Sequence, residues 1–119
     1  MLNQSVLVGR LTSDLEVRET ETGKHISTIT LAVPRSYKNE NGEYETDFID
    51  IVLWNSVAEN TAEYCRKGDM VGIKGRIQTS NYVTEDGTTR KYTEVVAEKV
   101  TFLSSKKNDE DEVWNRTGL

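Results

Sequence analysis

The sequence predicts a small all-β domain with one helix. Most apolar residues alternate with polar ones as in strands, the alternation gives way once to helical spacing, and glycine-containing turn signals separate the segments. A chain of 119 residues has room for one domain with a short appendage. We expect the folded domain to span residues 1–103 and residues 104–119 to form a disordered, charged tail.

Two strands are expected before the only proline. The first covers residues 3–11, and the second covers residues 25–33, which are β-branched almost throughout. Pro34 should end the second strand because proline cannot donate to a ladder. A polar connection with the hairpin signal Asn41-Gly42 then leads to the third strand.

The third strand, residues 47–54, has two different faces. One face is aliphatic, and the other carries Phe48 and Trp54 with Asp50 between them. Two interpretations are open: the rings belong to a core beneath a second layer, or they form half of a binding platform. The rings are separated by about 20 Å along the strand, which is room for several nucleotide bases.

One helix should follow. Ser56 and Glu59 have the spacing of a capping box, an apolar stripe ends at Cys65, and Gly68 is placed to stop the helix. A lone cysteine on that stripe is most simply a small buried hydrophobe.

Two further strands complete the domain. They cover residues 69–82 and 90–103, joined by a hairpin at Asp86-Gly87, and Gly72 and Gly75 suggest a bulge or bend in the first of them. The outward face of residues 69–82 should carry cations that end in an aromatic ring. The core of residues 90–103 should come from Val95, Val96, Val100, Phe102 and Leu103.

This order places the helix between the third and fourth of five antiparallel strands, which matches the oligonucleotide/oligosaccharide-binding (OB) fold, a Greek-key barrel. Its outer surface would combine Phe48, Trp54 and Tyr82 with Lys74 and Arg76, and Tyr37 would extend it through the hairpin. Interleaved rings and cations suit single-stranded nucleic acid. The net charge of −5 requires these cations to be segregated from the acids.

Other functions find little support in the sequence. His25 and Cys65 each stand alone, so neither a metal site nor a cofactor is expected, and Asp47 and Asp50 fall on opposite faces of their strand, unlike the paired carboxylates of a nuclease. We expect no enzyme. No stretch resembles a signal peptide or a membrane span, which predicts a cytoplasmic protein without membrane contact.

The chain resembles the bacterial single-stranded DNA-binding protein family, in the forms of Gram-positive bacteria and their phages. The matching segments, in order, are VLVGRLT at residues 6–12, TLAV at 30–33, DFI at 47–49, AENTA at 58–62, KG at 67–68, GRIQ at 75–78 and TEVVA at 93–97.

The resemblance implies a homotetramer that binds single-stranded DNA without sequence preference. It implies a role in replication, recombination, repair or DNA uptake, with partners among replication and recombination proteins. It also implies that the protein lies at the nucleoid. It assigns base stacking to Tyr37, Phe48, Trp54 and Tyr82. It assigns backbone contacts to Arg10, Arg35, Lys67 and Arg76.

The chain also departs from the family pattern. Asn55-Ser56 and Ser80-Asn81 stand where basic residues are common, which predicts weaker or more salt-sensitive binding. The usual acidic tip ending in Pro-Phe is missing, which suggests an accessory, competence-type or phage-encoded form. The acidic run at residues 109–112, followed by Trp114, is either a plain solvated segment or a short contact for a partner. The alternative function is a primosome-type interaction module with weak DNA binding.

Overall fold

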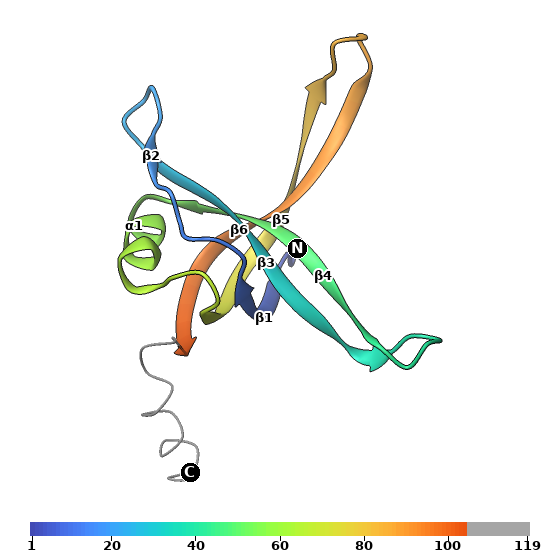
Figure 1. The fold of residues 1–119 in the computed structure, drawn as a ribbon. Coiled ribbons are helices and arrows are strands. Elements are labelled where there is room, and N and C mark those ends of the chain that lie inside the picture. Colours follow the sequence, from blue (N-terminus) through green and yellow to red (C-terminus); the bar gives the residue numbers. More distant parts are fainter. Residues whose placement is uncertain (105–119) are drawn as a thin grey trace.

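The computed structural model describes residues 1–104 as six strands and one helix (Figure 1). The expected class, mostly β with one helix, is confirmed. The helix was expected between the third and fourth strands and lies between β4 and β5. The numbers differ because the expected order did not include the short strand β2. The elements are β1 (Ser5–Leu11), β2 (Arg18–Glu19), β3 (His25–Lys38), β4 (Tyr44–Trp54), α1 (Asn55–Tyr64), β5 (Met70–Val83) and β6 (Thr89–Ser104).

The strands close into a barrel. Their order is β1-β5-β6-β4-β3-β2, and an additional pairing of β1 with β3 joins the ends, so that β2 alone lies outside the ring. This closure confirms the OB-fold prediction. The expectation of purely antiparallel strands is wrong for one pair, since β4 and β6 run parallel where Ile51 faces Val95 and Val52 faces Val96.

The core fills the barrel with the aliphatic faces of its strands. Ile51 and Leu53, which lie on the aliphatic face of β4, have no exposed surface, and Leu31, Val71 and Ile73 pack with them. The helix α1 closes one end of the barrel with Ala58 and Thr61. A fully buried aliphatic side chain contributes about 1.5–3 kcal/mol, so this inner layer dominates the stability of the barrel.

Two long hairpins, β3–β4 and β5–β6, project from the barrel in different directions (Figure 1). The first shows that Pro34 does not end its strand, because β3 continues to Lys38 and Pro34 lies opposite Thr46. The register shifts between Pro34 and Lys38, and such an irregularity is where a strand tolerates a residue without an N–H group.

The second hairpin contains the expected bend. The register between β5 and β6 shifts between Lys74 and Gly75, and a Cβ at Gly75 would lie 2.2 Å from the carbonyl oxygen of Val96. Only glycine allows the two strands to approach this closely. Phe102 and Leu103, predicted as core, are instead 45% and 42% exposed, because they lie where β6 leaves the closed part of the barrel.

The capping box is wrong. The helix begins at Asn55, one residue before Ser56, and no side chain of the described residues caps its N-terminus. Asn55 accepts a hydrogen bond from the backbone N–H of His25, and Glu59 pairs with the His25 ring instead of reaching back along the helix.

The other end of the helix also differs in detail. The helix ends at Tyr64, and Gly68 adopts a φ of 93° in the turn that follows. The guanidinium of Arg66 donates to the carbonyl oxygens of Ala62, Glu63 and Cys65, which satisfies acceptors left free at the end of the helix.

The described residues contain no helix that is long and apolar enough to cross a membrane. Of the expected tail, Ser104 is the last residue of β6, and residues 105–119 lie outside the described part of the chain.

Candidate nucleic-acid interface

The outer face of β4 carries the two rings that the alternation singled out. Phe48 is 66% exposed and lies opposite the small side chain of Ala32, while Trp54 is partly buried opposite Ile26. Phe48 is therefore not a core residue, and its ring is free to stack on a planar ligand.

A short row of side chains connects Phe48 with a cation. Arg10 on β1 lies opposite Ala32 on β3, which in turn lies opposite Phe48 on β4. Residues directly opposite each other point to the same side of a sheet, and two strand spacings amount to about 10 Å. The structure thus places Arg10 and Phe48 on one surface at a distance that suits a base and its phosphate.

Asp50, the carboxylate between the rings, is held by neighbours on both sides. It accepts a hydrogen bond of 3.2 Å from the Thr30 hydroxyl on β3 and one of 2.8 Å from the Tyr92 hydroxyl on β6. The bond to Asp50 raises the pKa of Tyr92 to about 12. Asp50 therefore links β3, β4 and β6 on the face that carries the rings.

A second row connects β4 with β5 through two side chains that are only 3% and 8% exposed, those of Val52 and Val96. Val52 on β4 lies opposite Val96 on β6, and Val96 lies opposite Arg76 on β5. Arg76 is exposed, and its guanidinium donates to the side-chain oxygen of Gln78 at 3.1 Å. Further along this face of β5 stands Tyr82, which is 50% exposed. The register places Arg76 and Tyr82 on the same side of the sheet as Phe48, but Val52 and Val96 between them are buried, so a continuous outer surface stays a prediction.

Lys74 lies elsewhere. It is exposed on β5 but falls before the bend at Gly75, opposite Val6 on β1 and Lys99 on β6. Among the described strands, no row of opposed residues connects it with Phe48 or Trp54. Its predicted role requires the nucleic acid to continue around the barrel.

Lys67 and Arg10 lie at one end of the barrel. The Arg10 guanidinium donates to the carbonyl oxygen of Gly68 at 2.9 Å, which places it beside the loop that carries Lys67. The backbone N–H of Lys67 donates to Asp14, while its side chain is exposed. The structure therefore brings these two predicted backbone contacts together.

Arg35 is the predicted cation whose charge is already compensated. Its guanidinium makes hydrogen bonds of 2.9 and 3.2 Å to Asp47 and one of 2.6 Å to Glu45. This pairing raises the pKa of Arg35 and lowers the pKa of Asp47. A phosphate would have to compete with two carboxylates for Arg35.

The arm formed by β3 and β4 adds aromatic surface. Tyr37 is 63% exposed, as expected for a stacking residue. Tyr44 is also exposed, and the Lys38 ammonium lies 5.7 Å from the centre of its ring. Tyr37 and Tyr44 are therefore both available on an arm that extends the platform away from the barrel.

Two further candidates, Arg90 and Tyr92, lie on β6 and were not predicted from the sequence. Arg90 lies directly opposite Tyr82, and Tyr92 lies opposite Ser80, so both share the outer face of β5. The alternation of residues 90–96 carried this signal, because Arg90, Tyr92, Glu94 and Val96 all fall on one face.

A closed five-stranded barrel with exposed rings and cations in rows across its outer strands defines an oligonucleotide-binding barrel. The chain belongs to the single-strand binding protein family, whose model matches residues 2–103.

Several relatives are about half identical to this chain. The "Single-stranded DNA-binding protein B" of Bacillus subtilis (strain 168) is 50% identical over 106 residues, which are 89% of this chain and 94% of that protein. The "Single-stranded DNA-binding protein 2" of Listeria monocytogenes is 51% identical over 109 residues, 92% of this chain and 68% of that protein. A "Single-stranded DNA-binding protein" of Streptococcus mutans is 50% identical over 106 residues, 89% of this chain and 65% of that protein.

Proposed function

We propose that this protein binds single-stranded DNA without sequence preference and without catalysis. The observation that carries the proposal is the row of Arg10, Ala32 and Phe48, which pairs an exposed ring with a cation across three strands. The names of the relatives, which describe single-stranded DNA-binding proteins, support the same substrate.

The mechanism follows from the two kinds of side chain. Stacking of a base on an aromatic ring contributes about 1–3 kcal/mol and hardly depends on which base it is. Arginine and lysine neutralise phosphates and release counterions, which makes the affinity depend on salt. A strand wound over Phe48, Trp54 and Tyr82 would therefore be bound whatever its sequence.

Such an activity protects unpaired DNA in replication, recombination, repair or DNA uptake, and proteins of those processes are the expected partners. It would place the protein in the cytoplasm, at the nucleoid. These roles follow from the proposed substrate.

We further propose that the functional form is a homo-oligomer, most simply the tetramer that the family resemblance implies. On β1, Val6 is 72% exposed and Val8 is 49% exposed, both on the outer face. Residues 5–9 pair with β5 on one side, while β3 meets β1 only at Arg10 and Leu11. An apolar strand with an open edge favours association with a second copy.

Titration of intrinsic tryptophan fluorescence with oligo(dT) tests the DNA proposal. A Trp114→Phe background leaves Trp54 as the only tryptophan, and its emission should be quenched on binding and recover as salt is added. Unchanged emission together with an unchanged sedimentation coefficient in the presence of a long oligo(dT) would instead support the interaction-module alternative.

A further inference from the structure

Asp50 occupies the position on β4 between the rings of Phe48 and Trp54, where bases are proposed to stack. Two residues, or about 7 Å, separate Asp50 from Phe48, and the side chains of a strand stand roughly perpendicular to the sheet. A base stacked about 3.5–4 Å from the Phe48 ring, on the side toward Trp54, lies above Asp50 with one edge turned to the sheet. The carboxylate is only partly buried, so it is within reach of that edge.

The carboxylate of Asp50 is held from both flanks. Its Oδ1 accepts a hydrogen bond of 3.2 Å from the Thr30 hydroxyl on β3, and its Oδ2 accepts one of 2.8 Å from the Tyr92 hydroxyl on β6. A carboxylate oxygen has two lone pairs, so each of the two oxygens keeps one free acceptor position. Asp50 therefore presents two acceptors side by side in a fixed orientation.

The charge of Asp50 is not compensated by a cation. Among residues 1–104, no ion pair involves it, and Glu94 on β6 lies close enough to Tyr92 to contribute, after the hydrogen bond to Asp50, to the raised pKa of that tyrosine. The row of Arg10 meets β4 two residues before Asp50, and the row of Arg76 meets it two residues after Asp50. Phosphates are attracted to the two arginines and repelled by the carboxylates between them. This distribution of charge favours a strand that turns its bases, and not its phosphates, toward Asp50.

The four bases differ in what they offer to such a pair of acceptors. Guanine has two adjacent donors, N1–H and the N2 amino group, on its Watson–Crick edge. Cytosine and adenine each have one amino group beside an acceptor nitrogen, and the single N–H of thymine lies between two carbonyl oxygens that a carboxylate repels. Unpaired bases are commonly read on this edge, and two parallel bonds to an ionised group are strong and specific. Guanine is therefore the base that matches Asp50.

We propose that Asp50 gives the surface a preference for guanine, which it binds through N1–H and the N2 amino group while the base stacks on Phe48. The inference rests on the proposed function and refines it, because stacking holds any base and Asp50 adds two hydrogen bonds for one of them. Asp50 is then a specificity-determining residue, and Thr30 and Tyr92 position it. A two-point contact of this kind discriminates about 5- to 150-fold between bases.

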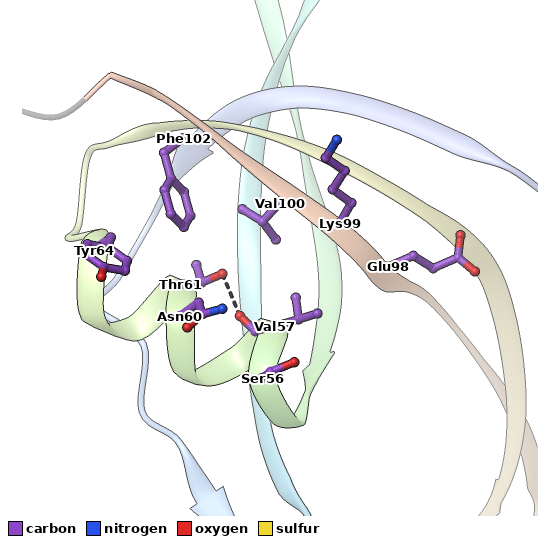
Figure 2. Close-up of a pocket in the computed structure, with 9 residues that line it drawn as sticks. All are labelled: Ser56, Val57, Asn60, Thr61, Tyr64, Glu98, Lys99, Val100 and Phe102. Atoms are coloured by element: carbon purple, nitrogen blue, oxygen red, sulfur yellow. Dashed lines mark hydrogen bonds between the residues drawn. The ribbon is translucent and has the colours of Figure 1, made fainter.

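A groove of about 440 Å³ between α1 and β6 is a second concave place that a base could enter (Figure 2). Its rings, Tyr64 and Phe102, are tilted by 42° with their centres 5.8 Å apart, whereas a base sandwiched between two rings needs about 7 Å. Glu98 is the carboxylate of the lining, and it points away from α1 in Figure 2. These features favour Asp50 over the groove as the guanine contact.

Inosine tests the inference on the unaltered protein. Its base differs from guanine only in lacking the N2 amino group, so it stacks in the same way and loses one of the two hydrogen bonds. Fluorescence anisotropy compares labelled d(GT) and d(IT) repeats of equal length, in a lithium buffer that does not support guanine quadruplexes. The d(GT) repeat should bind about fivefold more tightly, at the lower end of the range because one bond remains.

The variant Asp50→Asn identifies the carboxylate responsible. It keeps the shape of the side chain and can still bond both hydroxyl groups, but it loses the charge and one acceptor. The ratio of the two affinities should therefore fall toward one. Glu94→Gln is the matched control, because it removes the same charge from the same side of the sheet and should leave the ratio unchanged. Glu98→Gln is the corresponding control for the groove.

Four results would overturn the inference. The first two are equal binding of both repeats by the unaltered protein and an unchanged ratio in Asp50→Asn. A ratio that falls equally in Glu94→Gln would assign the preference to overall charge, and one that falls only in Glu98→Gln would assign it to the groove. Failure to bind either repeat would contradict the proposed function as well, so the two failures are distinguishable. The inosine comparison requires no variant and so does not depend on whether Asp50→Asn folds.

Discussion

At the scale of single residues, the surface depends on which charges are free and which are already paired. Arg35 is held by Asp47 and Glu45, whereas the Arg10 guanidinium, within residues 1–104, donates only to the carbonyl oxygen of Gly68. Two arginines with the same sequence-based assignment therefore differ in what they can offer a phosphate, because the carboxylates beside Arg35 lower the local potential.

Removing the rings should weaken DNA binding without unfolding the protein. Phe48→Ala is expected to lower the affinity for oligo(dT) by about 1–3 kcal/mol, roughly 5- to 150-fold in Kd, because a stacked base is lost. Trp54→Ala should act in the same direction. Fluorescence anisotropy of labelled oligo(dT) measures the effect, and Tyr64→Ala, which removes an exposed ring from α1, is the control. Equal losses for all three variants would contradict the platform.

Freeing Arg35 should strengthen binding. The double variant Glu45→Gln, Asp47→Asn removes both partners of the guanidinium, so Arg35 becomes available to a phosphate. One additional phosphate contact steepens the dependence of log K on log salt by about 0.7. Glu19→Gln with Glu21→Gln makes the same change in net charge on the β2 side of the molecule. If both double variants gain equally, net charge matters and Arg35 does not.

At the scale of elements, the period-two alternation was sufficient to predict the strands, and the ends of elements were not predictable. Ile51 and Leu53 are buried as expected because side chains alternate strictly along a strand. Pro34 and Ser56 were misjudged because the shift in register of β3 and the contacts of His25 with Asn55 and Glu59 depend on residues distant in sequence.

The candidate interface was likewise predictable where it depends on one strand and not where it depends on contacts between strands. The exposure of Phe48 follows from its own strand, but the partners of Asp50 are 20 and 42 residues away, at Thr30 and Tyr92. No local pattern indicates which strands will meet. The sequence can therefore predict on which face of its strand a ring lies, but it cannot predict the hydrogen bonds that Asp50 makes with other strands.

The link between Tyr92 and Asp50 should be visible at high pH. Because the folded-state pKa of Tyr92 is about 12 and an unfolded tyrosine has a pKa of about 10, its contribution to stability is complete below pH 10. That contribution is lost as the pH rises through 12. Tyr92→Phe should lower the free energy of unfolding at pH 8 by about 1 kcal/mol and remove the late-titrating tyrosine from the absorbance titration. A wild-type protein without a tyrosine titrating near pH 12 would contradict this.

The bend in β5 should tolerate glycine alone. Gly75→Ala would press a methyl group against the carbonyl of Val96, and backbone on both strands prevents relief, so we expect a loss of about 1–3 kcal/mol or more in urea unfolding. Gly72→Ala is the matched control on the same strand, since its nearest neighbours would lie at 3.7 and 3.8 Å, an ordinary contact. Similar losses at both positions would show that strand propensity, and not close approach, sets the cost.

At the scale of the whole molecule, an acidic chain is expected to bind an acidic polymer. The net charge of −5 would oppose binding if it were spread evenly. The structure instead distributes exposed cations over the barrel at Arg10, Lys67, Lys74 and Arg76, and none of them forms an ion pair with the described carboxylates. Local charge should therefore govern the interaction.

The salt dependence of DNA binding measures how many of these cations contact phosphates. Four phosphate contacts at about 0.7 each predict a slope near −3 for log K against log salt per protomer, and Arg76→Gln should reduce its magnitude by about 0.7. Arg18→Gln, on β2, removes the same charge outside the barrel and should leave the slope unchanged. Oligo(dT) binding measured at several salt concentrations gives the slope for each variant. A slope near zero would mean that DNA is held by its bases alone. Equal changes of slope in Arg76→Gln and Arg18→Gln would mean that the total charge of the molecule, and not the position of Arg76, controls the affinity.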